Sequence, residues 1–148
     1  MKSFKINTKV HGQAKEIFDR FDRELLIKTT PPLVNLEVNR FDGTKIGDEA
    51  HVVCSIFGTY QYWINRVVDN QQKEGEVYFV DKAIEMPEPF TYWKHTHKIT
   101  QVKDHTCLIT DEIVYSTHNK ILNLMIFPII YFIFYYRRPI YMDTFSDD

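Results

Sequence analysis

Most of the chain alternates apolar and polar residues with a period of two, which is the pattern of half-buried β-strands. Runs of this kind occupy residues 3–9, 34–39, 50–56, 60–69, 76–84, 90–102 and 105–116. Turn residues such as Asp42-Gly43, Gly58-Thr59 and Lys103-Asp104 separate neighbouring runs. Because consecutive strands joined by short turns pair antiparallel, we expect a seven-stranded antiparallel sheet.

Two other segments have helical spacing. In residues 13–28 the apolar positions recur every three or four residues, and Asp22 divides the segment into two short helices before Pro31-Pro32. In residues 121–136 (ILNLMIFPIIYFIFYY) only Asn123 is strongly polar, Pro128 lies near the middle, and Pro139 is expected to end the helix. Such a helix would be about 24 Å long, short of the roughly 30 Å of a hydrocarbon core.

A helix that is apolar on all sides must be buried on all sides, or it offers its exposed face to a membrane or a partner. A curved sheet can cover such a helix. We therefore predict one α+β domain, residues 1–148, in which the sheet wraps round the long C-terminal helix and the two short helices follow the first strand. We expect the aromatic residues of the C-terminal helix to lie more in the core than in a ligand site: Tyr131, Phe132, Phe134, Tyr135 and Tyr136. They cover more than one helix face, so the alternative is that some of them line a cavity or an exposed apolar patch.

The composition of the chain excludes some classes of function. The formal net charge is −2 and no basic stripe runs along the 148 residues, so we expect no nucleic-acid binding. The first ten residues lack the apolar segment of a signal peptide, and Cys54 and Cys107 lie in apolar strand patterns as expected for buried free thiols. These features predict a cytoplasmic protein without a metal or cofactor.

The strand at 92–99 carries the most informative polar residues. Because side chains alternate between the faces of a strand, Trp93, His95 and His97 share the face opposite the lysines and should point inward. The inward set of the following strand is Cys107, Ile109, Asp111, Ile113 and Tyr115. A three-residue turn centred on Asp104 would place His97 directly opposite Asp111. Asp81 of the preceding strand is expected to face inward as well.

Three interpretations of this cluster remain open. In the first it is structural, with Asp111 or Asp81 tethering Arg137 or Arg138 of the C-terminal helix, because an unpaired buried carboxylate is costly. In the second it is the polar end of an apolar ligand pocket. In the third His97 is a general base oriented by Asp111.

The order of elements and several motifs resemble those of the START-like, birch-pollen-allergen-like (SRPBCC) superfamily, which has the helix-grip fold. Within it the chain is most similar to the bacterial ligand-binding branch. The residues that carry the resemblance are 18–26 (FDRFDRELL), Pro31-Pro32, 40–43 (RFDG), 47–49 (GDE), 79–81 (FVD), Pro89-Phe90, Trp93-x-His95-x-His97, Asp111-x-Ile113-x-Tyr115 and Tyr136-Arg137.

The resemblance implies that an apolar small molecule, such as a lipid, an isoprenoid or quinone, or a polyketide, binds in a cavity between sheet and helix. The expected contacts are Trp63, Phe79, Asp81, Trp93, His95, His97, Asp111, Tyr115, Phe127 and Tyr131. We favour a binding protein over an enzyme. The alternatives are a small cyclase or dehydratase that uses His97 and Asp111, and a module that contacts a membrane surface or a second copy through its apolar helix.

Overall fold

The computed structural model describes residues 1–56 and 58–146, and its strands form one seven-stranded antiparallel sheet. The strands are β1 (Lys2–His11), β2 (Asn35–Phe41), β3 (Glu49–Ile56), β4 (Thr59–Lys73), β5 (Glu76–Glu85), β6 (Phe90–Lys103) and β7 (Thr106–Thr117). Their spatial order is β1-β7-β6-β5-β4-β3-β2, so β2 to β7 form a meander and β1 pairs with the last strand. The predicted sheet is confirmed.

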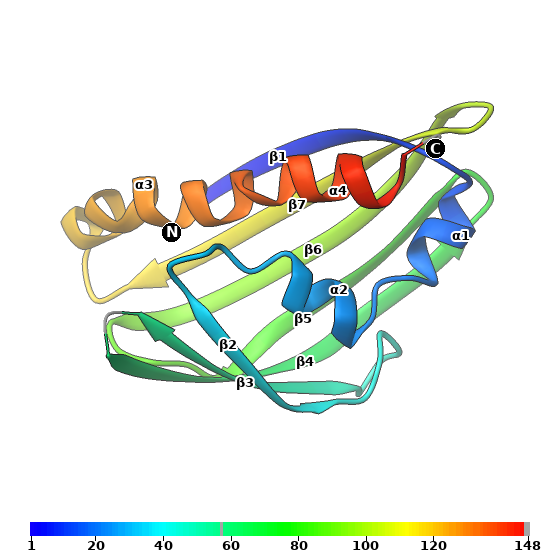
Figure 1. Cartoon of the computed structure of the whole chain (residues 1–148). Coiled ribbons are helices and arrows are strands. Elements are labelled where there is room, and N and C mark those ends of the chain that lie inside the picture. The colour runs from blue at the N-terminus through cyan, green and yellow to red at the C-terminus, as the bar shows by residue number, and fades with distance from the viewer. Residues whose placement is uncertain (57, 147–148) are drawn as a thin grey trace.

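Four helices accompany the sheet in the described part of the chain: α1 (Ala14–Phe18), α2 (Arg23–Lys28), α3 (Lys120–Tyr135) and α4 (Arg137–Thr144). The Asp22 side chain caps α2 by accepting a hydrogen bond from Leu25 N at 3.0 Å, which explains the break between the two short helices. In Figure 1, α3 and α4 run end to end beside β1 and β7, while the rest of the sheet curves away beneath them. This is the predicted helix-grip arrangement.

The predicted end of the C-terminal helix at Pro139 is wrong. The helix breaks briefly at Tyr136 and resumes as α4, in which Pro139 is the third residue. A proline is tolerated in the first turn because the backbone N–H groups there have no acceptor within the helix. Eight further residues therefore continue along the sheet.

The expectation that the aromatic residues of α3 lie mostly in the core is also wrong. The buried residues of α3 are Asn123, Ile130 and Phe134, and they face the sheet. Tyr131, Phe132 and Tyr135 are exposed on the other side. The sheet covers one face of the helix, because α3 packs against β1 and β7 at one side of the sheet.

Asn123 fastens the start of α3 to the end of β7. Its Oδ1 accepts hydrogen bonds from Thr117 N at 2.7 Å and Thr117 Oγ1 at 2.6 Å, and its carbonyl oxygen accepts one from Tyr115 OH at 2.6 Å. The one strongly polar residue of the apolar segment is thus buried and fully engaged in joining helix to sheet.

Buried side chains form two clusters along the concave face. The larger lies beneath α1, α2 and α4, and it includes Phe18, Phe21, Phe79 and Tyr141. The smaller lies beneath α3 and is built round Tyr115 and Phe134. The polar residues singled out above lie where these two clusters meet.

Candidate functional site

The register of β6 and β7 brings the predicted residues together. His97 lies opposite Asp111, as expected, although the hairpin achieves this differently. Its turn has two residues, Asp104 and His105, and a bulge between Gln101 and Lys103 restores the register that a three-residue turn would have given.

The hydrogen bonds are paired differently from the prediction. His95 Nε2 lies 2.7 Å from Asp111 Oδ1, and His97 Nε2 lies 2.9 Å from Asp81 Oδ2. The distance from His97 Nδ1 to Asp111 Oδ1 is 4.0 Å, too long for a hydrogen bond. Each histidine therefore bonds a carboxylate on a neighbouring strand that lies diagonally from it, and Asp81 rather than Asp111 orients His97.

Arg137 and Tyr141 of α4 lie beside these residues. We call Asp81, His95, His97, Asp111, Arg137 and Tyr141 the polar cluster. Arg137 Nη1 lies 3.6 Å from Asp111 Oδ1 and donates a hydrogen bond to Tyr141 OH at 3.2 Å. Of the ion pairs proposed between the sheet and the C-terminal helix, the structure contains the one between Asp111 and Arg137. Tyr141 was missed because the helix was expected to end at Pro139. Its spacing of four residues from Arg137 would have placed both on one helix face.

Burial sets the protonation states of the cluster. Desolvation, with His97 beside it, lowers the pKa of His95 to about 4 despite the Asp111 carboxylate. Burial works to raise the pKa of Asp111, but the hydrogen bond from His95 and the Arg137 charge outweigh it and hold that pKa below its usual value. Burial and the nearby Asp111 charge raise the pKa of Tyr141. At neutral pH, His95 is therefore a neutral hydrogen-bond donor to an ionised Asp111.

His97 occupies the boundary between the two clusters. Its ring stacks on Phe79 with centroids 4.1 Å apart and an interplanar angle of 7°. Phe21, between α1 and α2, meets the same ring edge-on at 6.1 Å. With Nε2 bonded to Asp81, the other nitrogen, Nδ1, is buried and has no hydrogen-bond partner. An unsatisfied buried nitrogen of this kind calls for an explanation.

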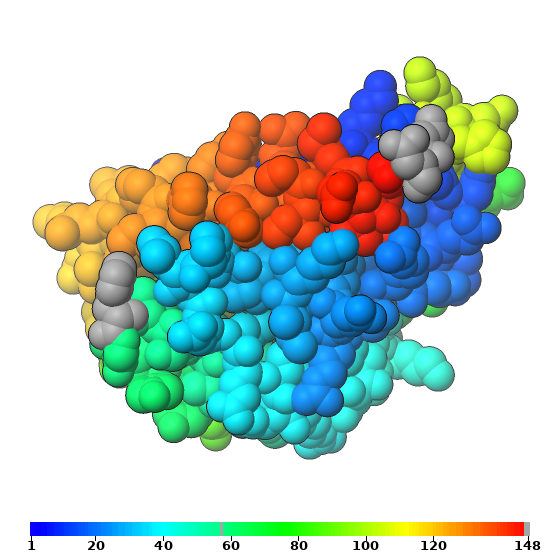
Figure 2. Space-filling view, viewed as in Figure 1, coloured from blue at the N-terminus to red at the C-terminus, as the bar shows by residue number. Residues whose placement is uncertain are grey.

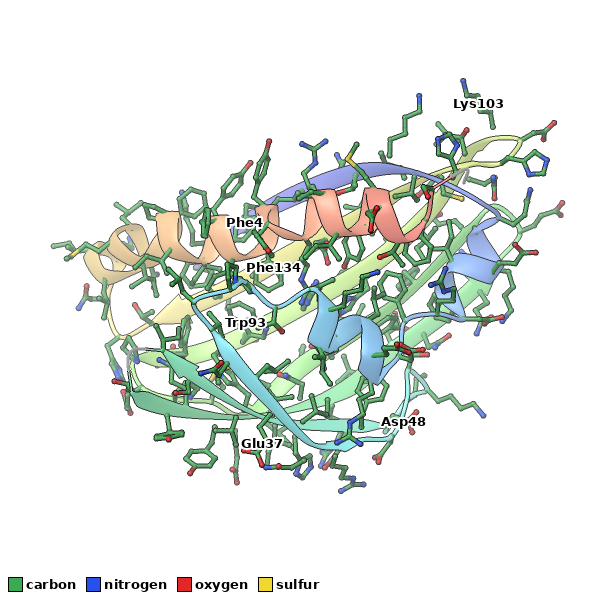
Figure 3. All side chains as sticks on the ribbon, viewed as in Figure 1. Phe4, Glu37, Asp48, Trp93, Lys103 and Phe134 are labelled. Atoms are coloured by element: carbon green, nitrogen blue, oxygen red, sulfur yellow. The ribbon has the colours of Figure 1, made fainter. Side chains whose placement is uncertain are left out.

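Aromatic rings fill the space between α3 and the sheet, where a cavity was expected. Trp63 lies 5.2 Å from Trp93 and 5.3 Å from Phe90, centroid to centroid. Trp93 in turn lies 5.9 Å from Phe134, and Figure 3 shows these two residues on the facing surfaces of β6 and α3. Trp63, Phe90 and Trp93 are half-buried, whereas Tyr115 is fully buried. We call Trp63, Phe90, Trp93, Tyr115 and Phe134 the ring cluster.

Two of the predicted contact residues lie elsewhere. Phe127 and Tyr131 pack against Phe4 of β1, at centroid distances of 5.5 Å and 5.3 Å, and have no ring contact with Trp63 or Trp93 among the described residues. Of the other eight predicted residues, four belong to the polar cluster, Phe79 stacks on His97 of that cluster, and three belong to the ring cluster. Phe90, the first residue of β6, belongs with them, although the strand pattern did not identify it as a contact residue.

Two open hollows mark the surface of the described residues. One, of ≈ 350 Å³, lies on α3 and is lined by Phe127, Pro128, Tyr131, Phe132 and Tyr135. The other, of ≈ 580 Å³, is lined by Tyr60, Tyr62, Ile84, Glu85, Met86, Pro87, Phe90 and Thr91. Because Phe90 lines the second hollow and contacts Trp63 and Trp93, that hollow adjoins the ring cluster.

Asp81, His95 and His97 each offer a potential metal ligand atom, and these atoms lie within 4.8 Å of one another. Both Nε2 atoms already bond carboxylates, and the positive Arg137 lies beside Asp111. We assign no metal to this group.

Comparison with known proteins gives the fold. No family model matches the chain, and no curated protein matches it. Among solved structures, the protein XoxI from Bacillus cereus has a TM-score of 0.67 at 12% identity, covering 99% of this chain and 97% of that one. Norcoclaurine synthase from Thalictrum flavum, in complex with a transition-state analogue, has a TM-score of 0.62 at 15% identity, covering 86% of this chain and 82% of that one. Major latex-like protein 151 from Panax ginseng has a TM-score of 0.57 at 18% identity, covering 80% of each chain.

At 12% to 18% identity these similarities show a shared fold, and they select neither a superfamily nor its bacterial ligand-binding branch. One of the similar proteins is an enzyme by name, so the fold does not decide between binding and catalysis. The chain therefore has the helix-grip fold, a seven-stranded antiparallel sheet with a long C-terminal helix.

Proposed function

We propose that this protein binds an elongated apolar small molecule, such as a lipid, an isoprenoid or quinone, or a polyketide-like compound. The apolar body of the ligand lies against Trp63, Phe90 and Trp93, and a hydroxyl group at its end hydrogen-bonds to His97 Nδ1. Entry is from the hollow beside Phe90, whose ring turns aside to admit the ligand.

The observation that carries this proposal is a pair of buried polar atoms beside Asp111. His97 Nδ1 and Arg137 Nε make no hydrogen bond to the residues that the structure describes. Their side chains approach the same carboxylate, because His97 Nδ1 and Arg137 Nη1 lie 4.0 Å and 3.6 Å from Asp111 Oδ1. Such atoms are costly unless something bonds them. A ligand hydroxyl, which can both donate and accept, would satisfy His97 Nδ1.

The dimensions of strand β6 favour an elongated ligand. Phe90 and His97 are seven residues apart on this strand, and at about 3.3 Å per residue the distance between them is roughly 23 Å. A compact molecule would reach Phe90 or the His97 imidazole but not both. An isoprenoid or acyl chain has the length to reach both.

Tryptophan fluorescence tests the proposal, because both tryptophans of the chain, Trp63 and Trp93, belong to the ring cluster. We expect a short-chain ubiquinol, whose hydroxyl groups can donate to His97 Nδ1, to quench this emission saturably. His97→Leu should weaken binding about tenfold, the effect of losing one hydrogen bond of roughly 1.5 kcal/mol. The exposed Val102 supplies a control, since Val102→Thr should leave the affinity unchanged. Non-saturating quenching that is equal in all three proteins would exclude the proposed site.

The His97–Asp81 pair favours a second candidate, an enzyme that removes a proton next to a carbonyl. With Nε2 bonded to Asp81, Nδ1 is the His97 nitrogen left for a substrate proton, which is the arrangement a general base requires. Asp81 orients the ring, and Arg137 of the same cluster balances negative charge.

Hydrogen–deuterium exchange would separate the two candidates. With phenylacetone in D₂O, followed by proton NMR, the enzyme should accelerate loss of the protons next to the carbonyl. His97→Gln should abolish the acceleration while ligand affinity changes little. If wild type and variant exchange the ketone at the same rate as buffer, the protein has no such activity and is a binder alone.

A further inference from the structure

An uninterrupted apolar stripe covers the outer face of α3 and continues onto α4. The exposed residues recur every three or four positions along the helix axis. The stripe consists of Ile121, Leu124, Met125, Pro128, Ile129, Phe132, Tyr135, Pro139 and Met142. In Figure 2 the side chains of α3 and α4 form a continuous band along the surface. The apolar hollow of ≈ 350 Å³ is lined by residues of α3, among them Pro128 and Phe132. Large exposed apolar patches mark sites of contact with membranes or proteins.

This stripe belongs to a helical stretch with unusual composition for a protein surface. Lys120–Thr144 spans 25 residues, is long and apolar enough to cross a membrane, and has a mean hydropathy of 1.3 over an 18-residue window of which 17% is buried. Its inner face, however, is fixed to the sheet by Asn123, Phe134 and Arg137. Crossing a bilayer would break these contacts, so the geometry fits a helix that lies flat on a surface.

Basic side chains flank the stripe. Lys120 is exposed at its start, and the Arg138 guanidinium lies 5.3 Å above the Tyr135 ring towards its end. Lys2 of β1 lies beside its middle, 4.5 Å above the Phe127 ring. α3 itself contains no acidic residue, and Asp143 of α4 is the first beyond it. An apolar face with basic flanks and interfacial tyrosines complements an anionic lipid surface.

We propose that the stripe docks this protein on the surface of an anionic bilayer, with α3 parallel to the membrane plane. Charge argues against a second copy as the occupant. A symmetric dimer apposes the same patch on both chains. An antiparallel pair of α3 helices would bring the lysine end of each against the arginine end of the other, and a parallel pair would bring identical ends together. Both arrangements oppose positive charges.

Vesicle flotation tests the proposal. We expect the wild-type protein to float with vesicles of phosphatidylcholine and phosphatidylglycerol, less with phosphatidylcholine alone, and progressively less as salt is added. Ile129→Glu and Phe132→Glu each remove a large exposed apolar side chain from the stripe and should weaken partitioning about tenfold or more. Val102→Glu makes a similar change at an exposed valine near the β6–β7 turn and should float as the wild type does.

The outcomes are decisive in both directions. Because Ile129 and Phe132 are exposed, their variants should retain the melting temperature of the wild type, so that lost flotation reports docking rather than unfolding. The proposal is overturned if the wild type stays in the dense fraction, or if Val102→Glu reduces flotation as much as Phe132→Glu does. It is equally overturned if sedimentation velocity shows a dimer that Phe132→Glu dissociates while no protein floats.

Discussion

At the scale of residues, the polar cluster shows how buried charges are made tolerable. Asp111 is 1% exposed, and its carboxylate persists there because His95 donates to it and Arg137 lies 3.6 Å away. Removing one partner from such a group costs far more than the pair contributes in total. The structural and ligand-binding interpretations of the cluster therefore coexist: Asp111 holds α4 in place, while His97 retains an unbonded nitrogen.

The pKa of His95 predicts how stability depends on pH. The folded pKa of about 4 lies below the ordinary value of 6.5, so the unfolded chain takes up a proton first as the pH falls. The contribution of neutral His95 is fully present above pH 6.5 and is lost progressively between pH 6.5 and about 4. Its size is on the order of 3 kcal/mol at most.

Urea unfolding at a series of pH values measures this contribution. The free energy of unfolding of the wild type should fall steeply between pH 6.5 and about 4. In His95→Gln the amide can still donate to Asp111, so we expect a lower free energy of unfolding at neutral pH and a smaller loss on acidification. NMR of the histidine ring protons gives an independent reading, with His95 not titrating until below pH 5. A His95 midpoint near 6.5 would contradict the burial argument.

At the scale of elements, the attachment of α3 depends on Asn123. We predict that Asn123→Leu lowers the free energy of unfolding by about 1–3 kcal/mol, because it leaves the buried Thr117 N–H without a partner. Leu124→Ala, at the next and exposed position, should change it by about 0.5 kcal/mol or less. Urea denaturation of both variants makes the comparison, and equal effects would show that Asn123 is not an anchor.

The sequence predicted the strands well because one face of each strand is buried and the other is exposed to solvent. That alternation specifies which side chains point inward, and it correctly placed His95, His97 and Asp111 on the concave face. Alternation also resolves Tyr60–Asp69 once the structure is known: Trp63 and Val67 face inward, and Tyr62 and Val68 face outward. β4 has an extra residue, Val68, between the pairs Val67–Asp81 and Asp69–Val80, and this bulge obscured the facing in the pattern.

The diagonal hydrogen bonds and the exposure of α3 could not be predicted. Which carboxylate a histidine reaches depends on side-chain rotamers, and strand pattern carries no information on these. A helix that is apolar on both faces has no hydrophobic periodicity that would show which face is buried. Its sequence therefore predicts burial on all sides even where the sheet covers only one. The outer stripe of α3 therefore becomes visible only when the position of the sheet is known.

At the scale of the whole molecule, the interior has two unlike halves. Beneath α1, α2 and α4 it is a closely packed core, with Phe21 stacked against Tyr141 at 6.0 Å. Beneath α3 it contains half-buried rings next to an open hollow, and the polar cluster lies between the halves. This division gives the proposed ligand an entrance at one end and a polar terminus at the other.

Native mass spectrometry of the protein, purified without detergent from cells and compared with a denaturing spectrum, tests the central claim most directly. The account predicts an added mass of a lipid-sized or isoprenoid-sized molecule that disappears on denaturation, and that is reduced when Trp93→Glu places a charge in the ring cluster. Phe132→Glu, on the outer stripe, should keep the added mass. A single apo mass, even after incubation with a total lipid extract, would contradict the claim that a ligand binds against the ring cluster.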